Sequence, residues 1–223
     1  MRLSEFVGDW SHYGSAAFDS YFDVTLPALR ASLESGNFVK PSNPFQPFQE
    51  VSFLNLKAVI MTSYPVTNDV LSTGRALDNR KVEAVSAEPG LRNFLKAIEA
   101  ETGKTSKAFS NNSSFLEHLP LQGVLIIPSI LTGNGNQPDA HLELWDGFTT
   151  KIVECIDRSK QNVLWYLLGS RPRFFQSKIT NTSHHVVTDA YPVKRGKQRF
   201  GRTGSIKEFS EKFLSMHNKN IVW

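Results

Sequence analysis

Four short runs of hydrophobic residues recur along the chain and predict the strands of a β-sheet. They occupy residues 57–62, 123–128, 162–169 and 184–188, and they are rich in Val, Ile and Leu. Within each run nearly every position is apolar, instead of every second position. This pattern is typical of parallel strands that helices cover on both faces.

Longer segments between these runs carry apolar side chains at every third or fourth position, which is the spacing of an amphipathic helix. They predict helices over residues 16–34, 89–102, 142–159 and 205–217. Alternating strands and helices predict a single α/β domain over residues 1–223. The fold class is a three-layer α/β/α sandwich with a central, mainly parallel four-stranded sheet.

The carboxyl ends of the predicted strands are the place to look for a site. Ligands bind to open sheets of this kind beyond the carboxyl ends of the strands. We therefore expect four segments to meet at one rim of the sheet, namely residues 62–67, 128–132, 169–171 and 189–196.

Composition excludes several classes of protein. Of the 223 residues, 40% are hydrophobic and 21% are charged, which is ordinary for a globular chain. No apolar run approaches the ~18 residues of a membrane span, and residues 1–6 contain no apolar segment of a secretory signal. Cys155 is the only cysteine, which excludes an internal disulfide and a thiolate zinc cluster. We expect an intracellular monomer with no cofactor and no membrane association.

The charge is unevenly distributed. The net charge is +4 and the sequence pI is about 9.2. From Arg171 to Lys219, Lys and Arg outnumber the three acidic residues Asp189, Glu208 and Glu211. Such asymmetry fits a surface that faces a polyanion such as DNA, and it equally fits a solvated basic face.

Motifs at the strand ends resemble those of the uracil-DNA glycosylase family. Residues 59–67 read Val-Ile-Met-Thr-Ser-Tyr-Pro-Val-Thr, where the family has Val-Ile-Leu-Gly-Gln-Asp-Pro-Tyr-His. Residues 123–132 are similar to the family's Gly-Val-Leu-Leu-Leu-Asn-Ala-Val-Leu-Thr, and residues 167–170 to Leu-Trp-Gly-Ser. His-His-Val at 184–186 is identical, and Tyr-Pro-Val-Lys at 191–194 stands where His-Pro-Ser-Pro is expected. The order and spacing of the motifs, over nearly the whole chain, imply the family 1-like fold.

The same resemblance implies that the family's catalytic groups are replaced. Tyr64 stands where the family has an Asp that positions water, and a neutral phenol is no substitute for a carboxylate. Tyr191 stands where a His holds the departing uracil oxyanion. Pro128, which has no donor, replaces the Asn that reads uracil. We therefore expect no classical uracil-DNA glycosylase activity.

The resemblance also assigns a base pocket. Leu77 replaces a Phe that stacks on the base, and Val66 replaces a Tyr that blocks position C5 of the base. The smaller Val66 either admits a bulky 5-substituent or reflects drift of a site that has lost its chemistry. The predicted catalytic residues are Tyr64, Tyr191 and Lys194, and the predicted base-pocket residues are Ser63, Val66, Leu77 and Pro128.

Basic residues near the last rim segment are the predicted DNA contacts. The resemblance places the basic, Gly-containing run 194–202 against the duplex, with Arg195 at the position of the family's wedge leucine. The histidine pair at 184–185 is not a metal site, because adjacent strand residues point to opposite faces. The predicted DNA-binding residues are Ser170, His185, Arg195, Lys197 and Arg199.

Three functional hypotheses follow. The first is an enzyme that flips a 5-substituted pyrimidine, of the kind found in hypermodified bacteriophage DNA, and modifies its 5-substituent as a transferase. The second is an inactive DNA-binding protein or reader of modified bases. The third is a divergent DNA glycosylase in which Asp69, Asp78 or Asp139 supplies a carboxylate from a nearby loop. The opened pocket at Val66 favours the first.

Overall fold

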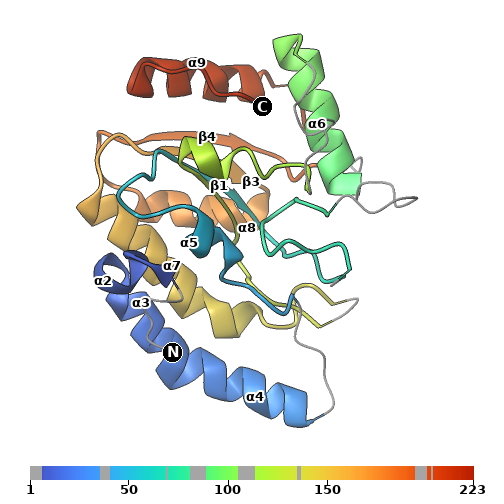
Figure 1. The fold of residues 1–223 in the computed structure, drawn as a ribbon, viewed down its shortest axis with the longest axis vertical. Helices are drawn as coiled ribbons and strands as arrows, with labels where there is room; N and C mark the ends of the chain where they lie inside the picture. The colour runs from blue at the N-terminus through green and yellow to red at the C-terminus, as the bar shows by residue number, and fades with distance from the viewer. Residues whose placement is uncertain are drawn as a thin grey trace.

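The computed structural model describes residues 7–35, 41–68, 70–80, 89–104, 114–134, 137–193, 200–201 and 203–223. In these ranges four parallel strands form one sheet in the order β2-β1-β3-β4 (Figure 1). The strands are β1 (Ala58–Thr62), β2 (Val124–Pro128), β3 (Leu164–Leu168) and β4 (His185–Asp189). They coincide closely with the four apolar runs, and the predicted fold class is confirmed.

The strand register brings the carboxyl ends of the strands level with one another. Thr62 at the end of β1 lies opposite Pro128 of β2 and Leu168 of β3. Leu168 in turn lies opposite Asp189 at the end of β4. The segments that follow the strands therefore leave the sheet at the same edge, as the sequence predicted.

One face of the sheet is covered by an aromatic layer, here called the α7 layer. Its helices are α2 (Trp10–Tyr13), α3 (Ser15–Ser20), α4 (Leu26–Glu34), α5 (Gln46–Glu50) and α7 (Leu142–Ser159). Val59 and Met61 of β1 point into it and meet a buried cluster that includes Phe48, Trp145 and Phe148. The near-continuous apolar character of β1 reflects burial on this face and on the opposite one.

The opposite face is covered by helices α6 (Pro89–Thr102) and α9 (Ser205–His217), and the side chains between them and the sheet are called the α9 layer. In Figure 1, α6 and α9 lie on one side of the sheet, while α7 and the N-terminal helices lie on the other. Ala58 and Ile60 of β1 point into the α9 layer, where Phe94 and Trp223 are also buried. The bounds predicted for α6, α7 and α9 are confirmed.

The helix predicted over residues 16–34 is confirmed, but it is not a regular α-helix throughout. A π-helical turn, η1 (Tyr21–Thr25), separates α3 from α4. Pro27 sits in the first turn of α4, where its ring lacks an N–H and would clash with the carbonyl four residues earlier in a regular helix. The wider π turn accommodates it, and the Thr25 hydroxyl donates a hydrogen bond to Leu144 O at 2.8 Å.

Shorter helical turns complete the connections. They are η3 (Pro120–Gln122), α8 (Ser170–Arg173) and η4 (Phe174–Lys178). With little more than one turn each, they carry no periodic pattern by which a sequence predicts them. Within the described ranges, no helix combines the length and apolar character that crossing a membrane requires.

Candidate functional site

A pocket of about 390 Å³ opens at the carboxyl edge of the sheet. Its walls come from the segments after β1 and β4, from residues 71–80, from the first turn of α6 and from the segment before α7. The lining residues are Tyr64, Pro65, Val66, Thr67, Leu77, Pro89, Gly90, Leu91, Pro138, Tyr191 and Val193. The predicted residues Tyr64, Val66, Leu77 and Tyr191 are therefore brought together.

Tyr64 and Tyr191 form two aromatic walls of this pocket. Their ring centroids are 6.5 Å apart and the rings meet edge to face, at 69°. Tyr64 packs against the α7 layer and Tyr191 against the α9 layer, so each wall is supported by a different face of the sheet. The space between them is bounded by rigid, amphipathic side chains that carry one hydroxyl group each.

Gly169, directly after β3, allows the chain to close behind Tyr191. Its φ is +106°, and a Cβ there would lie 3.1 Å from Ser63 Oγ and 3.3 Å from the Tyr191 Cβ. The Gly169 N–H donates to Asp189 O at 2.9 Å, which ties the end of β3 to the end of β4. A glycine is required here by both the backbone conformation and the close approach.

Asp189 holds the turn that leads into Tyr191. Its carboxylate accepts hydrogen bonds from the Ala190 N–H at 2.6 Å, the Ser205 hydroxyl at 2.6 Å and the Thr203 hydroxyl at 3.0 Å. Ser205 also pairs with the Tyr166 hydroxyl at 2.7 Å. Burial raises the pKa of Tyr166, so that phenol remains neutral. This carboxylate is engaged in holding structure and does not line the pocket.

The first turn of α6 forms the floor between Leu77 and Tyr191. A Cβ on Gly90 would lie 3.4 Å from the Tyr191 hydroxyl oxygen and 3.4 Å from Leu77 Cδ2, so the missing side chain leaves room for both. The first N–H groups of a helix have no partner within the helix and form the positive end of its dipole. The pocket therefore borders an electropositive helix terminus.

Two predicted base-pocket residues lie behind the wall. Ser63 is buried and its carbonyl accepts from the Ile130 N–H at 3.2 Å and the Ser129 hydroxyl at 3.1 Å. Pro128 closes strand β2 opposite Thr62. Neither is among the residues that line the pocket.

The two predicted DNA-binding residues that the structure describes, Ser170 and His185, lie at opposite edges of the sheet. Ser170 is exposed at the start of α8, on the same edge as the pocket. His185 begins β4 and so lies at the opposite edge, about 13 Å away along the strand. Its Nε2 is 3.0 Å from Glu208 Oε1 of α9. Lys194, Arg195, Lys197 and Arg199 lie outside the described residues.

Carboxylates near the pocket differ in availability. Asp78 is buried and bonded to Arg75, so it does not face the pocket. Asp139 is exposed and directly follows Pro138, a lining residue. Asp69 lies outside the described residues. Among the residues that are described, no group of three His, Cys, Asp or Glu side chains is arranged to hold a metal ion.

Sequence reasoning missed the lining residues that do not follow a strand. Pro89, Gly90 and Leu91 come from the start of a helix, and Pro138 comes from the segment before α7. The rule that ligands bind beyond the carboxyl ends of strands does not predict these residues. The Pro-Gly pair at the start of a strongly amphipathic segment was the available signal: Pro89 marks the start of a helix, and Gly90 marks a place where other residues approach closely.

Comparison with known proteins identifies the architecture. No protein-family model matches the chain. The crystal structure of mimivirus uracil-DNA glycosylase superposes with a TM-score of 0.83 at 16% sequence identity, covering 100% of this chain and 89% of that one. The chain has the uracil-DNA glycosylase fold.

Curated sequences agree with the fold. The uracil-DNA glycosylase of Borreliella burgdorferi is 28% identical over 210 residues, covering 91% of this chain and 90% of its own length. The uracil-DNA glycosylase of Clostridium perfringens is 24% identical over 226 residues, covering 99% of this chain and 97% of its own length. The resemblance found at the strand ends thus extends over nearly the whole chain.

These relatives correct two expectations. The hypothesis of a transferase that modifies a 5-substituent is wrong, because the matched relatives are named uracil-DNA glycosylases. The expectation that classical uracil-DNA glycosylase activity is absent is contradicted by the same relatives. That expectation treated Tyr64, Tyr191 and Pro128 as decisive losses. It considered Asp69, Asp78 and Asp139 as substitute carboxylates but not the start of α6, which borders the pocket.

Proposed function

We propose that the protein is a DNA glycosylase that hydrolyses the N-glycosidic bond of a uracil nucleotide. The observation that carries the proposal is the pocket between Tyr64 and Tyr191, at the carboxyl edge of a sheet with the uracil-DNA glycosylase fold. Relatives with that name match nearly the full length of the chain. The third hypothesis from the sequence, a divergent glycosylase, is therefore preferred over the inactive DNA-binding protein.

The substrate base enters the pocket by leaving the DNA stack. An enzyme cannot reach the glycosidic bond of a stacked base, so the nucleotide must be extruded at a cost of a few kcal/mol. A pocket of about 390 Å³ falls within the usual range for small-molecule sites. The rings of Tyr64 and Tyr191 and the side chain of Leu77 supply apolar surface that replaces the lost stacking.

The reaction breaks the bond between the sugar C1′ and the base nitrogen, and water adds to C1′. Negative charge develops on the departing base and positive charge on the sugar. The Tyr191 hydroxyl, close to Gly90, can donate a hydrogen bond to the base. The positive end of α6 stabilises the negative charge that develops on the base. We assign the role of stabilising the sugar cation or orienting the water to Asp139, because it is exposed and directly follows the lining residue Pro138.

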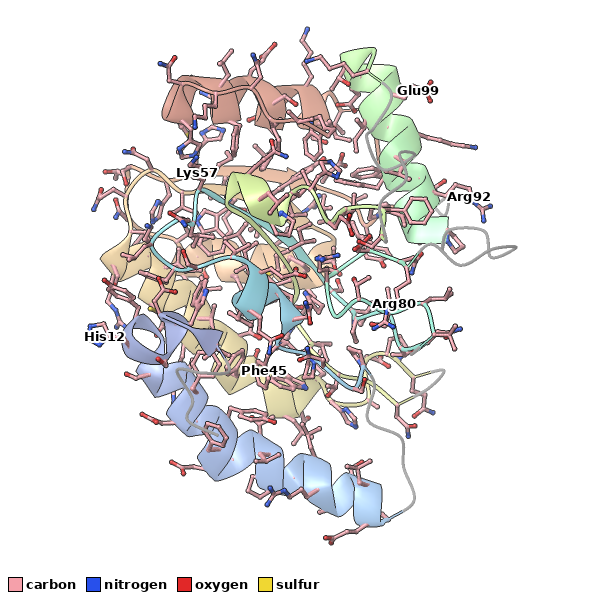
Figure 2. All side chains as sticks on the ribbon, viewed as in Figure 1. His12, Phe45, Lys57, Arg80, Arg92 and Glu99 are labelled. Carbon is pink, nitrogen blue, oxygen red and sulfur yellow. The ribbon has the colours of Figure 1, made fainter. Side chains whose placement is uncertain are left out.

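DNA approaches the edge of the molecule where the pocket opens. Figure 2 shows Arg80 and Arg92 on the side opposite Lys57, which precedes β1. Arg80 and Arg92 therefore lie toward the carboxyl edge, which also carries Ser170. Basic side chains at this edge give affinity that is independent of sequence and falls steeply with salt concentration.

The test is release of uracil from a single-stranded oligonucleotide that contains one uracil, detected as alkali-sensitive abasic sites. Tyr191→Phe removes the hydroxyl and keeps the ring, and Asp139→Asn removes the charge at similar size. Each should lower the rate by about a hundredfold, as expected for a group that stabilises transition-state charge.

The matched control is Tyr13→Phe, since Tyr13 stacks on Phe53 away from the pocket and should leave the rate unchanged. If the unmodified protein binds the oligonucleotide but forms no abasic sites, the glycosylase proposal fails. The inactive DNA-binding alternative would then replace it.

A further inference from the structure

Residues 71–80 run between two hollows of the molecule. On one side Leu77 lines the candidate base pocket. On the other side Thr73, Arg75 and Arg80 line a separate polar hollow of about 500 Å³, together with residues of α5 and with Ser114 and Glu117. Whatever fixes the conformation of this segment therefore also fixes one wall of the base pocket.

A buried cluster of charged groups fixes the segment. Arg75 donates through Nε to Glu50 Oε2 of α5 at 2.6 Å, and its Nη2 pairs with Glu50 Oε1. Through Nη1 it pairs with Asp78 Oδ2 and donates to Ser114 Oγ at 2.8 Å. Burial alone would lower the pKa of Arg75, but the hydrogen bonds and charges of Glu50 and Asp78 outweigh it and raise the pKa.

Asp78 anchors the same segment to the chain that precedes β2. Its side chain is 0% exposed, and Oδ1 accepts hydrogen bonds from the N–H groups of Phe115 at 3.0 Å and Leu116 at 2.9 Å. Both carboxylate oxygens are thus occupied. Two residues earlier, the Ala76 N–H donates to Ile126 O of β2 at 3.3 Å. These anchors flank Leu77 directly.

Leu77 itself adopts an unfavourable backbone conformation. Its φ is +61°, in the left-handed region, and its side chain is buried with its Cδ2 next to Gly90. A residue with a Cβ pays about 1–2 kcal/mol in this region. Such a conformation persists only where the surroundings over-determine it, and here the surroundings are the hydrogen bonds of Ala76 and Asp78.

We propose that Arg75 and Asp78 are positioning residues, which act through Leu77 to set the shape of the base pocket. The Glu50–Arg75–Asp78 cluster holds Leu77 in its left-handed conformation and so holds its side chain against the extruded base. The activity part of this inference rests on the proposed glycosylase function. The structural part concerns Leu77 alone and is tested separately.

The key variant is Asp78→Asn, which keeps the shape of the side chain but places an amide against the Arg75 guanidinium. Misplacing a pocket wall by about 1 Å costs about ten- to a hundredfold in rate. This loss should appear mainly as a higher KM for the uracil oligonucleotide, since Leu77 holds the base and does not take part in bond breaking.

Two comparisons separate positioning from general destabilisation. Asp157→Asn disturbs a buried carboxylate at the far edge of the sheet, where it accepts from Thr180 and Asn181, and should leave KM unchanged. Leu77→Gly removes the wall while glycine adopts the same φ without strain. In that background Asp78→Asn should have little further effect on KM, because the residue through which it acts is gone.

A readout independent of activity is the Leu77 methyl resonance in protein labelled with ¹³C-methyl leucine, with free uracil as the probe. Asp78→Asn should shift that resonance and weaken its response to uracil, and Asp157→Asn should do neither. If Asp78→Asn prevents folding, Glu50→Gln, which keeps the shape at a more exposed position, takes its place.

Equal KM changes in Asp78→Asn and Asp157→Asn, additive effects of Leu77→Gly and Asp78→Asn, or an unmoved Leu77 resonance would each overturn the inference. If the wild-type protein releases no uracil, the glycosylase proposal fails. The Leu77 resonance still decides the positioning role in that case.

Discussion

The two edges of the sheet differ. At the amino ends of the strands, side-chain hydrogen bonds hold connecting segments in place. At the carboxyl ends, the segments surround a pocket. Near the amino ends, Asp157 accepts three hydrogen bonds, from the Thr180 N–H and hydroxyl and from the Asn181 N–H. Near the carboxyl ends, Leu77 and Gly169 have positive φ, and Gly90 leaves space beside Tyr191. Positive φ also occurs at the amino edge, at Gly123 before β2 and Asn162 before β3. What distinguishes the carboxyl edge is that a residue with positive φ, Leu77, lines an opening there. We therefore expect substitutions at the amino edge to change stability, and substitutions around the pocket to change the proposed activity.

The largest effect expected from this comparison is on stability. Asp157→Ala removes the acceptor of two partly buried N–H groups and of a hydroxyl and should lower the free energy of unfolding by about 2 kcal/mol. Urea unfolding measures that loss. Uracil release per folded molecule should not change, because Asp157 lies at the edge away from the pocket. A parallel fall in uracil release would break the distinction between the two edges.

The next effect should combine stability with function. Gly169→Ala introduces strain of about 1–2 kcal/mol and a Cβ that lies 3.3 Å from that of Tyr191. It should also lower uracil release by about a hundredfold, because it displaces a pocket wall. The matched control is Gly103→Ala, where φ is +66° and a Cβ meets nothing within 4 Å. That variant should lose stability alone, and similar activity losses in both would contradict the interpretation.

A smaller effect should sharpen the description of the pocket. If Val66 leaves room beside position C5 of the base, DNA with a bulky 5-substituted uracil should bind more tightly than DNA with plain uracil. Val66→Tyr should reduce that preference by about tenfold, the value of a few buried methylene groups. Salt-dependent affinity for the DNA backbone should remain. Equal binding of both oligonucleotides by the wild-type protein would show that the Val66 space is unused.

The smallest effect expected is a loss of stability on acidification. Burial lowers the pKa of His141, His184 and His217 below the ordinary value of 6.5. The unfolded chain therefore binds more protons than the folded one below that pH, and stability declines as the pH falls. Urea midpoints at pH 7.5 and 5.5 measure the change. Stability that rises toward pH 5.5 would mean that these imidazoles gain partners when they are protonated.

The sequence predicted the helices and strands that carry a clear hydrophobic pattern. The strand β1 is a near-continuous apolar run, and the helices α6, α7 and α9 carry apolar side chains at helical spacing. Their predicted bounds were close or identical. The interruption at η1 was missed, because Pro27 falls at a position where a helix can also begin. Local patterns specify single elements well and the joints between them poorly.

The site was predicted where it follows a strand, and at Leu77, which the family resemblance supplied. Tyr64, Val66 and Tyr191 stand beyond β1 and β4 and were found. Gly90 and Pro138 approach the pocket through tertiary packing, which no local pattern encodes. The cluster of Glu50, Arg75 and Asp78 joins charges from distant parts of the chain. Nothing in the sequence pointed to Glu50 or Arg75 in this role, and Asp78 was considered only as a substitute catalytic carboxylate.

The two layers that cover the sheet become complete at different points along the chain. Buried side chains of the α7 layer come from residues 7–175. The α9 layer unites Leu91 and Phe94 of α6 with Phe209, Phe213 and Trp223. During translation, a ribosome that has released residues up to β3 and η4 therefore presents a sheet with one finished face and one bare apolar face. Bare faces of this kind favour aggregation, so the nascent chain is most exposed to chaperones in the interval before α9 emerges.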